Sequence, residues 1–264
     1  MLTFKHYYQP TTIDEAYKLF VEKEKSEIIG GCIFLRLLSR EIENAVDIYK
    51  CGLNFIKETD DTVEIGAMTT YGDLERSEII KNNFNGIIIK AIEHIVGIQL
   101  RNIISVGGTI VPKYGFSDLI TALMALETKL HFYKSGEILL TDYINSHKTE
   151  KDILTKISIN KTKSHFFYSN FKKSNNDYSV LNISLKKDAK NFKIYVGSRP
   201  KIAKLAEKAS SYISENEINH ENIIKASEIA AEELDFSTDI RAGKVYRKEL
   251  CKTLVERIIM EVVK

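Results

Sequence analysis

The sequence predicts a mixed α+β protein built in two parts, with a boundary near residue 160. Ahead of this point, short apolar segments typical of strands alternate with amphipathic segments typical of helices. Behind it, two strand-like segments at 164–188 and 191–198 are followed by three helical ones. A chain of 264 residues is long enough for each part to bury its own core.

The first part begins with a capped helix. PTTIDEAYKLFVEK predicts a helix whose N-cap is Thr12, because Glu15 follows three residues later and the apolar residues share one face. SEIIGG, at 26–31, is typical of a buried strand that ends in glycine, and we read 32–41 as a helix. Further strands are expected at 44–49, within 54–70 around an Asp60-Asp61 turn, at 129–144 as a hairpin with Gly136 in its turn, and at 151–159. Further helices are expected at 72–83, at 85–96 and from Ser117-Asp118 onwards.

The second part is read as antiparallel strands followed by helices. The helical segments run over about Pro200–Ser214, Ile218–Leu234 and Ala242–Val263. The last of them has an apolar face that either packs into the core or, as a second possibility, docks a partner.

Composition narrows the class of protein. The net charge of +2 gives no reason to expect binding to nucleic acid or to a membrane. Three widely spaced cysteines and six histidines show no metal-ligand spacing, so we expect no metal site. The apolar runs are too short to span a bilayer and the N-terminus lacks the pattern of a signal peptide, so we expect a cytoplasmic protein.

Two Gly-Gly pairs carry the chemistry that the sequence offers. IIGGCI contains Gly30 and Gly31, and SVGGTI contains Gly107 and Gly108. Glycine permits positive φ and a close approach of ligand to backbone, and a helix N-terminus attracts phosphate, so each pair is either a turn or half of an anion site. Neither pair fits GxGxxG or the phosphate loop that ends in GK[ST]. Asp118, at the start of an apolar helix, either caps that helix or binds a ribose hydroxyl.

The order of the motifs resembles one family. PTTIDEA, IIGGCIFL, EIGAMTTYGDLE, QLRNIISVGGTI, GFSDLITALMALE and VYRKEL follow one another along the whole chain. They resemble the FAD-binding subunit of molybdenum hydroxylases of the xanthine dehydrogenase and carbon monoxide dehydrogenase type. Each string alone is modest, but six in the same order are specific.

The resemblance implies a fold. It implies a two-lobed FAD-binding domain like that of vanillyl-alcohol oxidase over residues 1–160, with lobes of about 1–55 and 56–160. It also implies a C-terminal flavin-subunit domain over 161–264, with a three-stranded antiparallel sheet and a helical bundle.

The same resemblance assigns cofactor-binding residues. Both glycine loops would hold the pyrophosphate of FAD, Asp118 would lie near a sugar of FAD, and Leu154 would pack near one of its rings. YSNF places Asn170 where the family often has lysine, so Lys172 is the substitute. Because a Cβ at the second loop would block the pyrophosphate and strain a positive φ, Gly108→Val is expected to abolish FAD retention. The residues assigned to the two loops are Ile28, Ile29, Gly30, Gly31, Cys32 and Ile33, and Ser105, Gly107, Gly108 and Thr109.

The activity implied is electron transfer without catalytic acid–base residues in this chain. A molybdopterin-binding large subunit would oxidise the substrate, a [2Fe–2S] small subunit would pass electrons on, and FAD would deliver them to NAD or another acceptor. The family usually has polar side chains where this chain has Cys32 and Ile33, and asparagine where it has Thr109. These departures keep open the alternative of a non-catalytic scaffold subunit with weak or lost FAD binding.

Overall fold

The structure is a computed structural model that describes residues 1–146 and 151–263. Its contacts divide the chain into two compact units that interleave along the sequence. Unit 1 comprises Met1–Ile79, Gly97–Pro112 and Thr128–Asn160, and unit 2 comprises Ile80–Val96, Lys113–Glu127 and Lys161–Lys264. The boundary expected near residue 160 stays a prediction, because the division by contacts assigns two earlier segments to unit 2.

Unit 1 contains a small parallel sheet. Strands β1 (Thr3–Tyr8), β3 (Glu41–Asp47) and β2 (Ser26–Ile29) lie in the order β1-β3-β2, all parallel. Helix α1 (Ile13–Glu22) packs against this sheet, and Thr12 caps it by accepting the amide hydrogen of Glu15, as expected. The carboxyl ends of the three strands therefore meet at one edge, which is where the first glycine pair follows β2.

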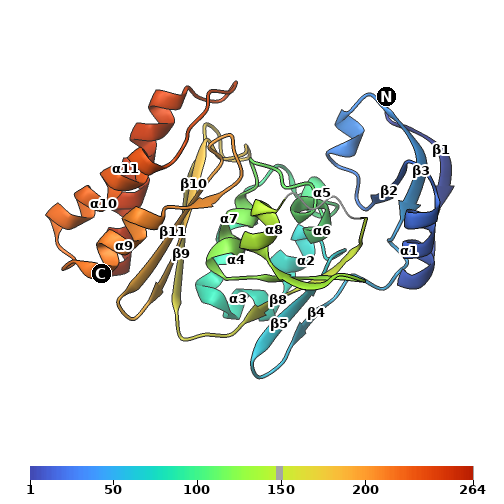
Figure 1. Ribbon diagram of the computed structural model, residues 1–264, viewed down its shortest axis with the longest axis horizontal. Coiled ribbons are helices and arrows are strands. Elements are labelled where there is room, and N and C mark those ends of the chain that lie inside the picture. Colours follow the sequence, from blue (N-terminus) through green and yellow to red (C-terminus); the bar gives the residue numbers. More distant parts are fainter. Residues whose placement is uncertain (147–150, 264) are drawn as a thin grey trace. The chain divides into compact units, whose positions relative to one another are not determined.

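A second, antiparallel sheet of five strands completes unit 1 (Figure 1). Its order is β4-β5-β8-β6-β7, and the amide of Thr59 closes the predicted Asp60-Asp61 hairpin by donating to the carbonyl of Thr62. The strands are β4 (Ile56–Glu58), β5 (Thr62–Gly66), β8 (Leu154–Asn160), β6 (Lys129–Phe132) and β7 (Gly136–Leu139). Short helices connect them: α2 (Tyr71–Arg76), α5 (Ile98–Arg101), α6 (Val106–Ile110) and α8 (Leu140–Asn145), with α3 (Glu78–Asn82) at the passage to unit 2.

Unit 2 is a sheet buried on both faces. Strands β12 (Lys204–Leu205), β11 (Asn191–Gly197), β10 (Leu181–Asp188) and β9 (His165–Phe171) lie in that order and are antiparallel. Helices α9 (Glu207–Glu215), α10 (His220–Glu233) and α11 (Lys244–Val263) cover one face. Helices α4 (Ile87–Ile92), which follows the 3₁₀ turn η2 (Phe84–Gly86), and α7 (Asp118–Ala125) pack against the sheet as well (Figure 1).

Strand β10 shows how this burial is achieved. Leu181, Ile183 and Leu185 lie in the hydrophobic core with α9, α10 and α11. The alternate residues Asn182 and Ser184 are also fully buried, but they hydrogen-bond to α7. Strand β10 therefore has one apolar face and one buried polar face.

Several expected elements differ from the structure. Residues 32–41 form a 3₁₀ turn, η1 (Leu35–Leu37), and no α-helix, because the chain must reach β3 by Glu41. Strand β1 was not expected, residues 140–145 leave the hairpin for helix α8, and the C-terminal sheet gains a short fourth strand, β12, beyond the three predicted. No helix in the described ranges combines the length and apolar character needed to cross a bilayer.

Candidate functional site

The first glycine pair forms a tight left-handed turn directly after strand β2. Gly31 has φ of +67° and Cys32 has φ of +56°. The amide of Cys32 donates to the carbonyl of Gly30 at 2.8 Å, which closes a three-residue turn. A Cβ on Gly31 would lie 2.1 Å from the carbonyl oxygen of Ile103, while the residue itself is exposed to solvent on its other side. Glycine is therefore required at Gly31 by both its backbone conformation and the backbone beneath it.

The second glycine pair lies in right-handed helix α6. Ser105 is the N-cap, and its Oγ accepts the amide hydrogen of Gly108 at 3.1 Å. The amides of Val106 and Gly107 donate to the carbonyls of Thr69 (2.9 Å) and Ala67 (2.7 Å). The first N–H groups of α6 are thus satisfied by the chain itself.

The expected positive φ at Gly108 is wrong, because both glycines of this pair lie in the right-handed helix. The reason given for the effect of Gly108→Val changes accordingly. A Cβ at this position would lie 2.8 Å from the capping hydroxyl of Ser105, so it would first disturb the helix cap.

The segment Gly66–Thr70 brings the two pairs together, and sequence reasoning assigned this segment no role in the site. A Cβ on Gly30 would lie 2.7 Å from Sδ of Met68, and one on Gly107 would lie 3.0 Å from Cβ and the carbonyl oxygen of Ala67. A Cβ on Gly108 would lie 3.6 Å from the carbonyl oxygen of Gly30. The two glycine pairs are therefore neighbours on one surface of unit 1, with Gly31 and Gly108 exposed there.

The side chains next to the glycines are directed into the protein. The hydroxyl of Thr109 donates to the carbonyl of Ser105 at 3.0 Å and is 3.1 Å from the hydroxyl of Tyr71. Ile33 is buried, and burial raises the pKa of the Cys32 thiol, with a further contribution from the Asp47 carboxylate. These side chains beside the glycines pack within the protein. The backbone of the glycines is therefore the part that faces solvent.

The remaining predicted residues of unit 1 lie in its core. Ile29 is buried in a cluster with Ile42 and Ala45, and Ile28 packs at the edge of the cluster that includes Met68. Leu154, at the start of β8, is buried. Their expected contacts with a cofactor stay predictions.

A cluster at the carboxyl edge of the parallel sheet was missed. Asp47, at the end of β3, accepts hydrogen bonds at Oδ2 from the hydroxyl of Tyr7 (2.5 Å) and from Nε2 of Gln9 (3.1 Å). The hydrogen bond to Asp47 is the main reason that the pKa of Tyr7 is raised to about 12. The charge of Asp47 also helps to raise the pKa of the Cys32 thiol, after burial, so the cluster acts electrostatically on the turn that carries Cys32. The signal in the sequence is weak, since β1 reads as mostly polar and its partner strand is far along the chain.

Unit 2 contains the predicted Asp118. Ser117, and not Asp118, caps helix α7, by accepting the amide hydrogen of Ile120 at 3.1 Å, so the capping interpretation of Asp118 is wrong. The Asp118 carboxylate is fully buried. Asn170 lies on β9, and the ammonium of Lys172, just after that strand, donates to the carbonyl of His94 at 3.3 Å. That Lys172 binds the cofactor stays a prediction.

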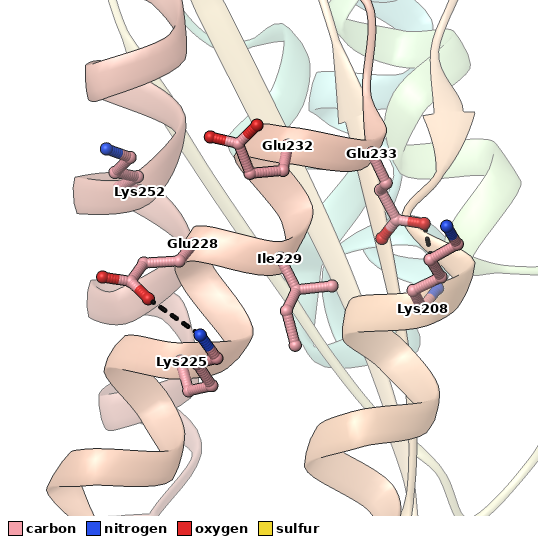
Figure 2. Close-up of a pocket in the computed structure, with 7 residues that line it drawn as sticks. All are labelled: Lys208, Lys225, Glu228, Ile229, Glu232, Glu233 and Lys252. Carbon is pink, nitrogen blue, oxygen red and sulfur yellow. Dashed lines mark hydrogen bonds and ion pairs between the residues drawn. The ribbon is translucent and has the colours of Figure 1, made fainter.

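A surface pocket of about 370 Å³ lies among α9, α10 and α11 (Figure 2). Charged side chains line it, and several already have partners: Lys225 pairs with Glu228 at 3.5 Å, and both carboxylate oxygens of Glu233 accept backbone amide hydrogens at the start of α9. We interpret it as the solvated side of a helix bundle. The lining residues are Lys208, Lys225, Glu228, Ile229, Glu232, Glu233 and Lys252.

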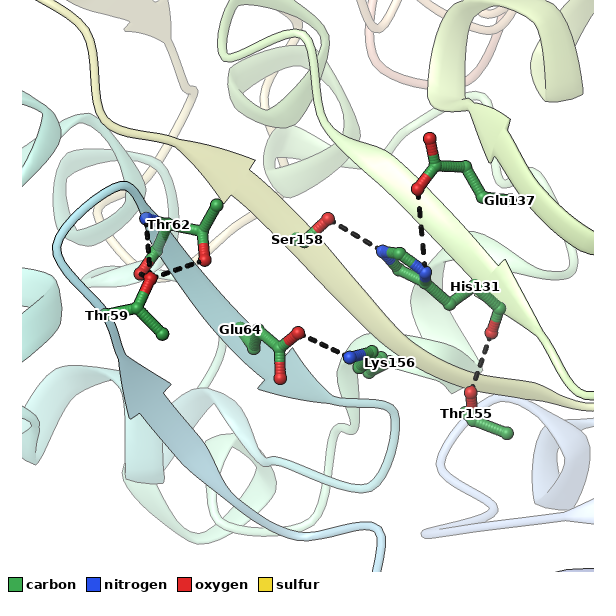
Figure 3. A network of polar contacts seen from close by, with 8 residues as sticks. All are labelled: Thr59, Thr62, Glu64, His131, Glu137, Thr155, Lys156 and Ser158. Atoms are coloured by element: carbon green, nitrogen blue, oxygen red, sulfur yellow. Dashed lines mark hydrogen bonds and ion pairs between the residues drawn. The ribbon is translucent and has the colours of Figure 1, made fainter.

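A polar network lies on the five-stranded sheet (Figure 3). Nε2 of His131 is 2.7 Å from the hydroxyl of Ser158, and its Nδ1 is 3.9 Å from Glu137. The second distance is too long for a hydrogen bond, so the three residues do not form a catalytic triad. Burial, followed by the charge of Lys156, lowers the pKa of His131. Lys156 itself pairs with Glu64, and the network is cross-strand pairing on a sheet face.

Two family models identify the class of protein to which this fold and glycine surface belong. The family model described as "FAD binding domain in molybdopterin dehydrogenase" matches residues 2–161, and "CO dehydrogenase flavoprotein C-terminal domain" matches residues 166–262. The first model covers more than half of the chain. The chain therefore belongs to this family of oxidoreductases, it is a flavoprotein, and FAD is its cofactor.

Individual relatives are distant but match over nearly their full length. The 6-hydroxypseudooxynicotine dehydrogenase complex subunit alpha of Paenarthrobacter nicotinovorans is 22% identical, over 94% of this chain and 90% of its own. The glyceraldehyde dehydrogenase medium chain of Sulfolobus acidocaldarius is also 22% identical, over 97% of both chains. Among solved structures, a chain of quinoline 2-oxidoreductase from Pseudomonas putida 86 is similar with a TM-score of 0.87 and 19% identity, over 97% of this chain and 95% of its own. At this identity the likeness shows the shared fold.

The residues present fit FAD. A diphosphate needs a surface where backbone can approach closely, and the exposed glycines Gly31 and Gly108 provide one. A polyol or ribose needs hydrogen-bond acceptors, and Oδ2 of Asp118 is a buried acceptor without a hydrogen-bond donor among the described residues.

Proposed function

We propose that this chain is the FAD-binding electron-transfer subunit of a multi-subunit molybdenum-containing dehydrogenase of the cytoplasm. The observation that carries the proposal is the convergence of the two glycine pairs on the segment Gly66–Thr70 within unit 1. Family membership supports FAD as the group that this surface would hold. FAD supplies the redox chemistry when bound, and the protein supplies its position and its electrostatic surroundings.

The residues proposed to hold FAD divide by the part of the cofactor that they suit. The backbone of the turn Gly30–Cys32 and of the helix start Ser105–Thr109 would face the pyrophosphate. Asp118 would accept a hydrogen bond from a sugar or polyol hydroxyl, and Leu154 would support a ring. The pyrophosphate loops are Ile28–Ile33 and Ser105–Thr109, and Lys172 completes the set.

The proposed partners are a molybdopterin-binding large subunit and a [2Fe–2S] small subunit, with NAD or another compound as electron acceptor. Support comes from relatives named as a complex subunit alpha and as a medium chain, each of which this chain matches over nearly its full length. We also propose an FAD-binding domain over 1–160, with lobes of about 1–55 and 56–160, and a C-terminal domain over 161–264. The two family models support this division, because their matched ranges meet between residues 161 and 166.

A scaffold subunit with weak FAD binding is the second candidate. It is favoured by the second loop, where the amides of Val106, Gly107 and Gly108 are already bonded within the chain and the hydroxyl of Thr109 is committed to Ser105. Fewer donors are then left for a phosphate at that loop than at a typical helix N-terminus.

The two candidates are separated by the flavin content of the protein purified with its partners. The electron-transfer subunit is expected to retain about one FAD per chain and to show flavin bleaching when the complex is given its reducing substrate. The scaffold would be supported by a complex that assembles and reduces an artificial electron acceptor although it lacks flavin. Such a complex would also fail to take up added FAD. Mass spectrometry of the released flavin distinguishes FAD from FMN.

A further inference from the structure

The Asp118 carboxylate has one saturated oxygen and one without a donor. Its Oδ1 accepts hydrogen bonds from the hydroxyl of Tyr168 (2.5 Å), from the hydroxyl of Ser179 and from Nδ2 of Asn182 (2.8 Å). Its Oδ2 is buried and has no hydrogen-bond donor in the described part of the chain. Three donors on one oxygen and none on the other is an arrangement that holds a carboxylate in a single orientation.

This asymmetry is costly for a buried carboxylate unless something else donates to Oδ2. Buried polar atoms are nearly always paired, and a charged oxygen has the largest desolvation penalty. Within the described ranges no lysine or arginine pairs with Asp118, and its position in the first turn of α7 supplies only the helix dipole. The orphaned oxygen is therefore the observation that points to a ligand which donates hydrogen bonds.

The three donors are themselves fixed. Nδ2 of Asn182 also donates to the hydroxyl of Ser198 at 3.0 Å, and its Oδ1 accepts from the hydroxyl of Thr121 at 2.8 Å, so its amide cannot rotate without loss of several hydrogen bonds. Tyr168 is buried on β9, and burial and the charge of Asp118 raise the pKa of its phenol well above the ordinary value. It is protonated at neutral pH and acts as a donor. These residues lie 50 to 64 positions from Asp118 in the sequence.

We propose that Tyr168, Ser179 and Asn182 are positioning residues, which saturate Oδ1 of Asp118 and so leave Oδ2 to accept a hydrogen bond from a hydroxyl group of the bound flavin cofactor. The proposal rests on the proposed function, because it needs FAD to bind this chain. It names a chemical class of contact, a hydroxyl of either the ribityl chain or the ribose. It also gives the three donors a role that the resemblance does not.

The test is a double-mutant cycle on FAD affinity, with the full-length protein or the complex with which it co-purifies, whichever retains FAD. Asp118→Ala is expected to weaken FAD binding by about 10- to 100-fold, since it removes a hydrogen bond to a charged group. Tyr168→Phe is expected to weaken it by about 3- to 10-fold, because one of the three hydrogen bonds that orient Asp118 is lost while the carboxylate itself remains. In the Asp118→Ala background Tyr168→Phe is expected to change the affinity by less than about twofold, since it acts only through the carboxylate.

Variants of two buried serines distinguish the positioning of the Asp118 carboxylate from a general effect on packing. Ser184 lies on β10, is fully buried, and donates to the carbonyl of Thr121 at 2.6 Å, but it does not contact Asp118. Ser179→Ala is expected to lower FAD affinity and Ser184→Ala is not, although both remove a buried hydroxyl that is bonded to helix α7. The melting temperature of each FAD-free variant measures the structural effect, which is expected to be similar for the two.

Each possible outcome decides one part of the proposal. Wild-type protein that binds no FAD would overturn the proposed function itself. Wild-type protein that binds FAD, with Tyr168→Phe equally harmful in the presence and absence of Asp118, would overturn the positioning role. FMN identifies the hydroxyl: Asp118→Ala weakens FMN binding as well as FAD binding if the partner is the ribityl chain, and only FAD binding if it is the ribose. If Asp118→Ala changes FMN binding and FAD binding equally and only slightly, Oδ2 has no flavin partner.

Discussion

The two glycine pairs share a dipeptide but meet different physical requirements. At Gly30-Gly31 the chain turns through left-handed backbone, with φ of +67° at Gly31, directly after a parallel strand. At Gly107-Gly108 the backbone is an ordinary right-handed helix start, and glycine is present because Ala67 and the Ser105 hydroxyl lie too close for a Cβ. The first pair is required by backbone conformation and the second by packing.

The two loops also differ in the number of backbone amides that they leave for a ligand. The first N–H groups of α6 are bonded within the chain, to Ala67, Thr69 and the cap. In the first loop the Cys32 amide closes the turn, whereas the exposed Gly31 has no acceptor for its amide among the described residues. A phosphate group is therefore expected to depend more on donors of the first loop and on the close approach that the second loop permits.

The largest expected effect is that of Gly31→Ala. The new Cβ would meet the carbonyl oxygen of Ile103 at 2.1 Å and would force alanine into left-handed backbone. We expect the free energy of unfolding, measured by urea denaturation, to fall by about 3 kcal/mol or more. Gly52→Ala is the matched control, because Gly52 has φ of +71° but no atom within 4 Å of the added Cβ, so it should cost only about 1 kcal/mol. Equal losses at the two positions would show that the contact with Ile103 does not matter.

Hydrogen exchange separates the donors of the two loops. In FAD-free protein the amides of 106–108 are expected to exchange slowly, since each is hydrogen-bonded, and the amide of Gly31 is expected to exchange fast. If the proposed contacts are right, FAD should slow exchange in the first loop by about tenfold or more, and in the second by much less. Equal added protection at the two loops would contradict the division of labour.

A smaller effect tests the packing role of the second pair. Ser105→Ala is expected to cost about 1 kcal/mol, because it removes the cap of α6. Gly108→Ala in the wild-type protein should have a net effect close to zero, since displacement of the Ser105 hydroxyl cancels the better helix propensity of alanine. In the Ser105→Ala background the same change should stabilise by about 0.5–1 kcal/mol. Additive effects in urea denaturation would contradict the contact at 2.8 Å between the Cβ and the hydroxyl.

Local signals in the sequence predicted local structure. The Thr12 cap and the Asp60-Asp61 hairpin are confirmed, because each depends on residues within a few positions. The helix expected at 32–41 was wrong, since the chain has to reach β3, which pairs with β1 and β2, by Glu41 and forms only a 3₁₀ turn before it. Strand β1 itself is mostly exposed, so it lacks the alternation that marks a half-buried strand.

The site could be predicted only in outline for the same reason. The glycine pairs were visible as motifs, but the segment Gly66–Thr70 that joins them acts through contacts across the sequence. Asp118 was visible as the first acidic residue of a helix, but its donors Tyr168 and Asn182 lie on strands that follow much later in the chain. Residue types indicated the chemistry, and the pairing of distant strands supplied the geometry.

The smallest expected effect concerns Cys32, the residue after the first glycine pair. Its φ of +56° is unfavourable for a residue with a Cβ, by about 1–2 kcal/mol. Cys32→Gly removes that cost but adds freedom to the unfolded chain, so the net gain in the free energy of unfolding should be about 0.5 kcal/mol. Cys32→Ala keeps the Cβ and serves as the control, without the gain. If the glycine variant is less stable than the alanine variant, as is usual at positions with ordinary backbone, then the left-handed turn is not the conformation of this loop in solution.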